Sequence, residues 1–239
     1  MARRRFFVDS VHGGRAHITG EEAHHLTRVL RVEAGQKFEI SDNFNLYLAE
    51  IESVRKDLVS FAVLKRLEPI EPAVHSVLLV SLIKFERLEW IIEKATELGA
   101  EGIIPVEAER SEKGLARAAA KRLERWRRIA REASEQSRRH RLPEVEPCIQ
   151  LRAALSTEAS YRYMLEEQTA SPILGALPAE RTPQDRVALL VGPEGGWTDR
   201  ERESISAAAW KPVSLGREIL RAETAAIAGL AILNAAWLK

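Results

Sequence analysis

The sequence predicts an α/β fold in which a mostly parallel sheet carries helices on both faces, preceded by a small β domain. Short runs rich in Phe, Val, Ile and Tyr fill the first seventy residues. After them, apolar runs alternate with amphipathic stretches, which is typical of parallel sheets. Pro69 and Pro72 mark the change of pattern. We therefore expect two domains, at residues 1–71 and 72–239.

The N-terminal domain is expected to contain four strands and one helix. The strands are expected at residues 5–8, 37–41, 46–51 and 58–64. Thr19 and Glu22 have the spacing of a capping box, and Ala23, Leu26 and Val29 follow at helical spacing. A small β-barrel or closed sheet is the natural package for these elements.

The C-terminal domain is expected to alternate strands with helices. Strands are expected at residues 77–83, 103–106, 145–149, 161–165 and 187–191. Helices are expected at residues 88–98, 115–137 and 223–238, and after a capping box of Thr198 and Glu201. Trp126 falls on the apolar stripe of the second helix, so we assign it to the core.

Charge is distributed unevenly along the chain. The net charge is +1, but residues 110–141 hold twelve Lys or Arg against four Glu, a local excess of eight positive charges. A solvated helix face explains most such runs. Ten of the twelve are Arg, which binds phosphates and stacks on bases better than Lys, so the run also suits RNA.

Composition excludes several classes of protein. Cys148 is the single cysteine, so an intramolecular disulfide and a Cys-based metal cluster are excluded. No apolar run approaches the roughly 18–20 residues that cross a bilayer. The basic N-terminus lacks the apolar stretch of a signal peptide. We expect a cytoplasmic protein with no metal and no membrane span.

A glycine-rich turn follows the expected strand at 187–191. The turn reads Gly192-Pro193-Glu194-Gly195-Gly196, and ligands bind at such turns at the carboxyl ends of parallel strands. An ordinary tight turn would look the same. The chain contains neither G-x-G nor a P-loop motif, which argues against a Rossmann-type dinucleotide site.

A second strand-to-helix transition lies at residues 213–224. Ile219 and Leu220 offer an apolar slot for a planar ring. Arg221, Glu223 and Thr224 open the final helix, where a carboxylate or hydroxyl also serves as an ordinary cap.

Several motifs together resemble the SPOUT superfamily of methyltransferases, and more narrowly the small-subunit ribosomal RNA (uracil-N3) methyltransferase E family. The motifs are GPEGGWTDRE at 192–201, LGREILRAETAA at 215–226, KFERLEWIIEKATELG at 84–99, EASEQSRR at 132–139, RRFFV at 4–8 and HLTRVLR at 25–31. They span nearly the whole chain. Phe85 departs from the glycine that similar sequences usually have beside Lys84, which leaves the local path after the first strand of the second domain open.

The resemblance implies a PUA-like N-terminal β-barrel and a C-terminal domain with a trefoil knot. It also implies a homodimer that binds S-adenosylmethionine in the knot and methylates N3 of one uridine in 16S ribosomal RNA, as free RNA or as the 30S subunit. The two loops then hold the cofactor. The expected cofactor-binding residues are Leu190, Val191, Gly192, Pro193, Glu194, Gly195, Gly196, Leu215, Gly216, Ile219, Leu220, Arg221 and Thr224.

Catalysis at uracil N3 requires loss of a proton. We expect Arg221 to stabilise negative charge on a uracil oxygen, and Glu223 to act as the base or to orient Arg221. The alternative is that both residues are structural. Cys148 lies in an apolar pattern and is expected to be buried and inert, which disfavours C5 methylation and leaves N- or O-methylation.

Contacts to RNA are expected from two sources, the small N-terminal domain and the basic segment at residues 110–141. The candidates are Arg3, Arg4, Arg5, Arg28, Arg31, Arg131, Gln136, Arg138 and Arg139. His24 and His25 are assigned to packing or surface positions. Two rival functions remain: ribose 2′-O-methylation of RNA, and a non-catalytic RNA-binding assembly factor. The intact glycines of both loops argue against the second rival.

Overall fold

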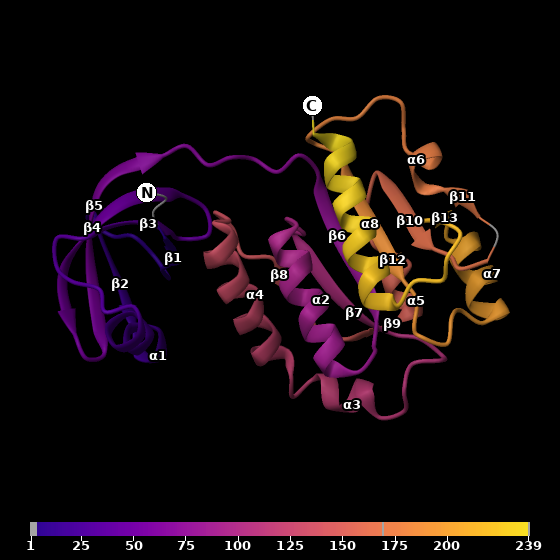
Figure 1. Ribbon diagram of the computed structural model, residues 1–239, viewed down its shortest axis with the longest axis horizontal. Helices are drawn as coiled ribbons and strands as arrows, with labels where there is room; N and C mark the ends of the chain where they lie inside the picture. The colour runs from indigo at the N-terminus through magenta and orange to yellow at the C-terminus, as the bar shows by residue number, and fades with distance from the viewer. Residues whose placement is uncertain (1–3, 169, 239) are drawn as a thin grey trace. The chain divides into compact units, whose positions relative to one another are not determined.

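The chain forms two compact units in a computed structural model that describes residues 4–168 and 170–238 (Figure 1). The first unit runs to Glu71 and also contains Ser134–Leu142. The second unit contains Pro72–Ala133 and the chain from Pro143 onward. The sequence pattern did not indicate that residues 134–142 return to the first unit.

The first unit is built on a five-stranded sheet with strand order β1-β3-β4-β5-β2. The strands are β1 (Arg5–Phe7), β2 (Arg15–Thr19), β3 (Lys37–Ser41), β4 (Leu46–Arg55) and β5 (Leu58–Leu67). β1 is parallel to β3, and the other pairs are antiparallel. Alternate side chains point inward, so Ile18, Ile40, Ile51 and Phe61 form a buried core.

Helix α1 (Gly20–His24) in the first unit continues into the π-helix η1 (His25–Val29). The predicted capping box is wrong, because the Thr19 side chain makes no capping hydrogen bond. Thr19 instead ends β2 and pairs with Leu58 of β5. The sequence analysis did not predict β2, whose five residues include only two buried apolar side chains, Ala16 and Ile18.

The second unit is built on an eight-stranded sheet with order β11-β13-β10-β12-β6-β7-β8, and β9 also pairs with β7. The strands are β6 (His75–Ser81), β7 (Gly102–Glu107), β8 (Glu144–Val145), β9 (Ile149–Gln150), β10 (Tyr161–Leu165), β11 (Ser171–Pro172), β12 (Arg186–Val191) and β13 (Lys211–Ser214). Every one of these pairs is parallel. The predicted mostly parallel α/β sheet is confirmed.

Helices cover both faces of this sheet, as predicted. They are α2 (Phe85–Glu97), α3 (Leu115–Ala119), α4 (Leu123–Ser137), α5 (Leu151–Ala154), α6 (Ile173–Ala176), α7 (Asp199–Ala207) and α8 (Ala222–Trp237). Leu78 and Leu189 share one core with Leu88 of α2 and Leu230 of α8. The alternate residues Leu79 and Leu190 face the other core, with Ile205 of α7. Figure 1 shows α2 and α8 side by side on one face.

Two predicted elements are divided in the structure. The prediction of a single helix at residues 115–137 is wrong, because turns at residues 120–122 separate α3 from α4. Helix propensity gives no sign of this break, since Ala, Lys and Arg all favour helices. The strand predicted at residues 145–149 is replaced by the two short strands β8 and β9, because Pro147 between them cannot donate to a ladder. Trp126 is fully buried, as predicted.

Two further expectations concern the starts of α7 and α2. Thr198 and Glu201 form the predicted capping box of α7. Phe85 is the first residue of α2, and its ring lies edge-on to Trp126 at 5.8 Å between centroids.

None of the described helices is long and apolar enough to cross a membrane.

Candidate active site at the carboxyl edge of the parallel sheet

A cavity of about 340 Å³ lies within the second unit where β10, β12 and β13 end. Most of the predicted cofactor-binding residues line it: Val191, Gly192, Pro193, Glu194, Gly196, Leu215, Gly216, Ile219, Leu220 and Arg221. Leu190, Gly195 and Thr224 are not among its lining residues. Parallel strands bring the two loops together because their carboxyl ends share one edge of the sheet.

The glycine turn, residues 192–196, needs glycine for steric reasons. A Cβ at Gly192 would lie 3.0 Å from Cε2 and Nε1 of the buried Trp197 indole. Gly196 has a φ of +68°, and a Cβ there would lie 2.3 Å from Oε1 of Glu167. The backbone of the turn therefore lies directly against its neighbours and lines the cavity itself.

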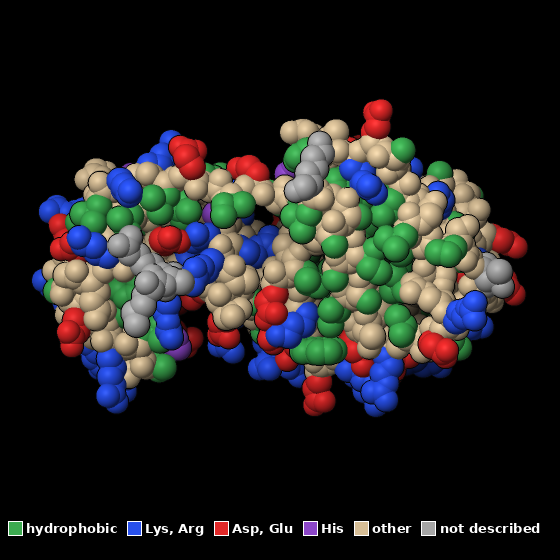
Figure 2. Space-filling model, turned by 45° about the horizontal axis from the view of Figure 1, so that its top comes forward, with side chains coloured by type: hydrophobic (Ala, Val, Ile, Leu, Met, Phe, Trp, Pro, Cys, Tyr) green, Lys and Arg blue, Asp and Glu red, His purple; other side chains and the backbone are tan. Residues whose placement is uncertain are grey.

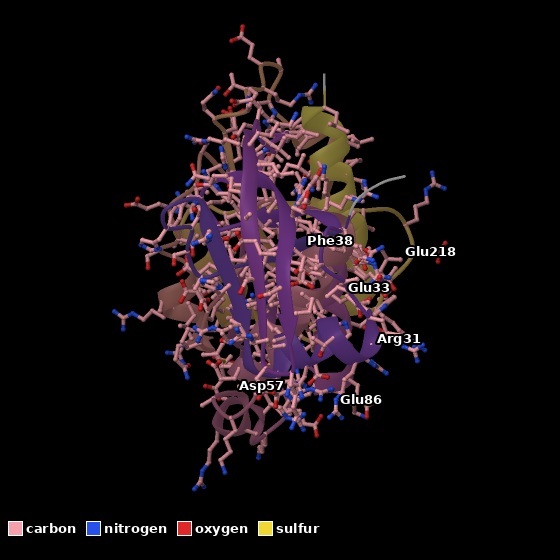
Figure 3. All side chains as sticks on the ribbon, turned by 90° about the vertical axis from the view of Figure 1, so that its left-hand side faces the viewer. Arg31, Glu33, Phe38, Asp57, Glu86 and Glu218 are labelled. Atoms are coloured by element: carbon pink, nitrogen blue, oxygen red, sulfur yellow. The ribbon has the colours of Figure 1, made fainter. Side chains whose placement is uncertain are left out.

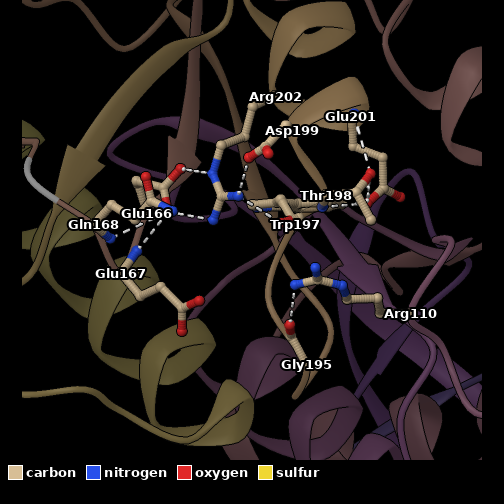
Figure 4. A network of polar contacts seen from close by, with 10 residues as sticks. All are labelled: Arg110, Glu166, Glu167, Gln168, Gly195, Trp197, Thr198, Asp199, Glu201 and Arg202. Atoms are coloured by element: carbon tan, nitrogen blue, oxygen red, sulfur yellow. Dashed lines mark hydrogen bonds and ion pairs between the residues drawn. The ribbon is translucent and has the colours of Figure 1, made fainter.

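Arg202 of α7 holds the end of this turn in place (Figure 4). Its guanidinium makes two hydrogen bonds to the carboxylate of Glu166, at 2.8 and 3.2 Å, and also donates to the carbonyl of Trp197. Burial acts to raise the pKa of Glu166, but hydrogen bonds from Arg202 and from the backbone of Gln168 and Glu167 outweigh it. The pKa of Glu166 therefore lies below its ordinary value, and the carboxylate is ionised at neutral pH.

The loop after β7 supports the other side of the turn (Figure 4). Nη1 of Arg110 donates to the carbonyl of Gly195 at 2.8 Å. The backbone N–H of Glu109 donates at 2.8 Å to Oε1 of Glu201, whose other oxygen accepts from the backbone of Thr198. The capping residue Glu201 is buried, so one carboxylate connects the start of α7 to the β7 loop.

The second loop, residues 215–221, is much more exposed. Ile219 is 77% exposed and Leu220 is 37% exposed, although both line the cavity. Arg221 precedes α8 as its N-cap residue and also lines the cavity. These side chains form an apolar wall with one cation beside it.

Glu223 is placed differently from Arg221. It is buried in the first turn of α8 and is not among the cavity's lining residues. Its Oε1 lies 3.9 Å from Nε of Arg87, and Nη1 of Arg87 donates to Oε1 of Glu194. No described contact joins Glu223 to Arg221.

Arg87 is a site residue that the sequence analysis missed. It lies in the first turn of α2 and lines the cavity. It lies within the motif at 84–99, but neither its residue type nor its spacing indicated which groups it would meet. Glu166 and Glu167 after β10 were missed for the same reason.

The lining of the cavity carries an excess of negative charge. Arg87 and Arg221 supply two positive charges, and four carboxylates come from Glu166, Glu167, Glu194 and Glu218. Arg202 compensates Glu166 from outside the lining, so one negative charge remains in excess, which favours a ligand with positive charge.

Most of the predicted RNA-binding residues fall in the first unit, and Arg131 falls in the second. Arg3 lies outside the described residues. Arg4, Arg28, Arg31, Gln136 and Arg138 are exposed, while Arg131 and Arg139 are half-buried. Arg5 is also half-buried, pairs with Glu39 at 2.7 Å and donates to the carbonyl of Arg138. Figure 2 shows Lys and Arg side chains across the visible face of the first unit, and Figure 3 labels Arg31 next to η1.

Cys148 and the two adjacent histidines lie outside the cavity lining. Cys148 is half-buried rather than fully buried, because it lies between β8 and β9 and not within a strand. Burial, with a smaller effect from Glu107, raises the pKa of its thiol to about 11, so it is a poor nucleophile at neutral pH. His24 is half-buried and contacts Asp57, and His25 is exposed.

Comparison with protein families decides the identity of this architecture. A model described as "RNA methyltransferase domain" matches residues 70–234, and one described as "RNA methyltransferase PUA domain" matches residues 18–64. The chain belongs to the RNA methyltransferase family. The expected resemblance and the expected pairing of a PUA-like domain with an α/β domain are confirmed.

Individual relatives agree with this assignment. Ribosomal RNA small subunit methyltransferase E of Bacillus subtilis is 36% identical over 231 residues, which cover 91% of this chain and 88% of that protein. The same enzyme of Neisseria gonorrhoeae, in a crystal structure with S-adenosyl methionine bound, is 30% identical with a TM-score of 0.89, covering 99% and 98% of the two chains. A putative methyltransferase from Legionella pneumophila with bound cofactor SAM is 29% identical with a TM-score of 0.89, covering 99% and 98%.

Proposed function

We propose that this protein uses S-adenosylmethionine to methylate N3 of a uridine in 16S ribosomal RNA. The observation that carries the proposal is the cavity formed by the glycine turn and the second loop, in a chain that matches small-subunit rRNA methyltransferases over nearly its full length. Two of its structural neighbours were solved with this cofactor bound.

The residues of the cavity fit S-adenosylmethionine. The main chain at Gly192 and Gly196 lines the cavity and can meet a ligand directly, and Ile219 with Leu220 offers an apolar surface to a purine ring. The positive charges of the cofactor's sulfonium and ammonium together exceed the negative charge of its one carboxylate. That net positive charge is complementary to the excess of carboxylates around the cavity.

When bound, the cofactor supplies an activated methyl group, so the chain mainly has to orient the reactants. We assign to Arg221 the stabilisation of negative charge on a uracil oxygen, because it combines exposure with a place in the cavity wall. Glu223 is buried beside Arg87, so we favour an orienting role for it over that of a general base. The proton of N3 then leaves to water or to another group of the assembled complex.

The remaining parts of the proposal concern architecture and partners. The family resemblance supports a trefoil knot around the two loops, a homodimer and a cytoplasmic site of action. The PUA domain and its exposed Arg residues support RNA binding by the first unit. The substrate is the free RNA or the assembled 30S subunit.

The decisive experiment is methyl transfer to small subunits that lack the modification, followed by nuclease digestion and mass spectrometry. We expect N3-methyluridine at one position. A ribose 2′-O-methylated product would support the rival enzyme activity instead. Absence of S-adenosylmethionine binding in calorimetry would support a non-catalytic RNA-binding factor.

The role of Arg221 is tested by Arg221→Ala in single-turnover methylation. We expect the rate to fall about 10²–10³-fold, as for the loss of other groups that stabilise developing charge. Cofactor affinity, measured in parallel, separates this effect from loss of binding. A rate near that of the wild type would refute the electrostatic role.

A further inference from the structure

Arg87 joins three segments that are distant in the sequence. It belongs to the first turn of α2, where its N–H donates to the carbonyl of Lys84 at 3.0 Å. Its guanidinium contacts Glu194 of the glycine turn and lies 3.9 Å from Glu223 of α8. One side chain of α2 therefore connects the glycine turn to the first turn of α8.

The position of this cation is unfavourable for α2 itself. The N-terminus of a helix carries partial positive charge, so an Arg in the first turn is disfavoured there. The adjacent carboxylates of Glu194 and Glu223 offset that cost. The local sequence of α2 gives no reason for an Arg at this position. The carboxylates of Glu194 and Glu223 provide one.

Glu223 depends on this contact. Its side chain is only 9% exposed, and Arg87 is the only cation paired with it among the described residues. Its Oε2 is buried and has no hydrogen-bond partner among those residues. Removing that cation would leave a buried carboxylate without a partner, which is costly.

Arginine suits this position better than lysine. Its planar guanidinium presents donors on several sides and can serve two carboxylates at once, whereas an ammonium is a compact point charge. In this structure Nη1 faces Glu194 while Nε faces Glu223. Lysine would keep the charge but lose that geometry.

We propose that Arg87 is a positioning residue that sets the distance between the two walls of the cofactor cavity through Glu194 and Glu223. The inference rests on the proposed function, because it assumes that S-adenosylmethionine binds in this cavity. Arg87 acts by holding the glycine turn and the start of α8 in register. The cofactor then meets both walls without first reordering them.

The test measures the Kd for S-adenosylmethionine, the KM and kcat of methyl transfer, and thermal unfolding of the full chain. We expect Arg87→Gln to raise the Kd about tenfold and Arg87→Lys to raise it about threefold. Lys94→Gln is the matched control. Lys94 lies on the same helix and also pairs with two carboxylates, Glu93 and Glu97, but does not line the cavity.

A double-mutant cycle separates positioning from a merely structural role. The effects of Arg87→Gln and Glu194→Gln on the Kd should be non-additive, whereas Lys94→Gln should add independently to either. A lower unfolding temperature with unchanged cofactor Kd would overturn the inference and leave Arg87 as a structural residue. A fall in kcat alone, without coupling to Glu194, would also overturn it, because Arg87 would then touch the RNA substrate directly.

These outcomes differ from failure of the proposed function. If the wild-type protein binds S-adenosylmethionine and methylates the subunit while Arg87→Gln does so equally well, only the positioning role fails. If the wild-type protein itself does not bind the cofactor, the proposed function fails first.

Discussion

The two loops that line the cavity are built in contrasting ways. The glycine turn is held by Arg110, Arg202 and the buried ring of Trp197. In the second loop, the hydroxyl of Ser214 bonds with Gly216, and the large apolar residues Ile219 and Leu220 face solvent. One wall of the cavity is therefore formed in advance, while the other depends on a ligand to cover its apolar surface. The comparison predicts that substitutions in the glycine turn lower both the stability and the cofactor affinity. Substitutions in the second loop should lower the cofactor affinity alone.

The largest effect is expected from Gly192→Ala in the glycine turn. Its Cβ would lie 3.0 Å from the buried Trp197 indole, so the ring or the turn would have to shift. We expect a loss of about 1–3 kcal/mol in unfolding free energy, typical of overpacking, and a Kd for S-adenosylmethionine raised at least tenfold. Urea unfolding and calorimetry measure the two quantities.

Gly216→Ala is the matched control in the second loop. No atom lies within 4 Å of a Cβ built there, and its φ is not positive. Its unfolding free energy should stay within about 0.5 kcal/mol of the wild type. Equal destabilisation by the two substitutions would contradict the contrast between the loops.

Glu166→Gln, which removes the ionic partner of Arg202, is expected to lower the unfolding free energy by an amount similar to that of Gly192→Ala. The Glu166 side chain is 6% exposed, so we expect a loss of about 1–3 kcal/mol at pH 7. The folded pKa of Glu166 is lowered, so the unfolded chain takes up its proton first as the pH falls. This contribution is therefore complete above about pH 4.5 and declines below it as the pH falls through the lowered pKa.

Unfolding measured at a series of pH values checks this prediction. The difference between the wild type and Glu166→Gln should be constant above about pH 5 and should narrow in more acidic solution. Glu52→Gln serves as the control, because the Arg15–Glu52 pair in the first unit is exposed and should contribute under about 1 kcal/mol. A difference that grows toward acid pH would show that Glu166 is not held ionised by Arg202.

The smallest effect is expected from Ile219→Ser in the second loop. The side chain is already 77% exposed, so the stability of the free protein should hardly change. If a purine ring covers it on binding, the Kd for S-adenosylmethionine should rise about three- to tenfold. An unchanged Kd would mean that the cofactor does not use this wall.

Much of the fold was predictable because it depends on local patterns. The apolar run at 187–191 predicted β12, and Thr198 with Glu201 predicted the start of α7. Where the prediction failed, distant contacts decided the outcome. Thr19 became the end of a strand because β5 pairs with it, although its spacing to Glu22 suits a cap equally well.

The candidate site likewise has a part that could be predicted from the sequence and a part that could not. Both loops could be located from the sequence, because glycines and a strand-to-helix transition leave a local signature. The residues that support the loops could not be located, because Arg87, Arg202 and Glu166 are of types that usually lie on the surface. Their roles arise only when parallel strands end at one edge and bring those segments together.

The sequence by itself determined the class of fold, the positions of the two loops that line the cavity, and the family, since these follow from short-range patterns and motifs. The tertiary structure alone decided that Glu223 faces Arg87 rather than the cavity, and that residues 134–142 join the first unit. It also decided which loop is held by side chains from other elements. The physical reason is that charge pairing and steric fit depend on distances across the folded chain, and no local pattern encodes those distances.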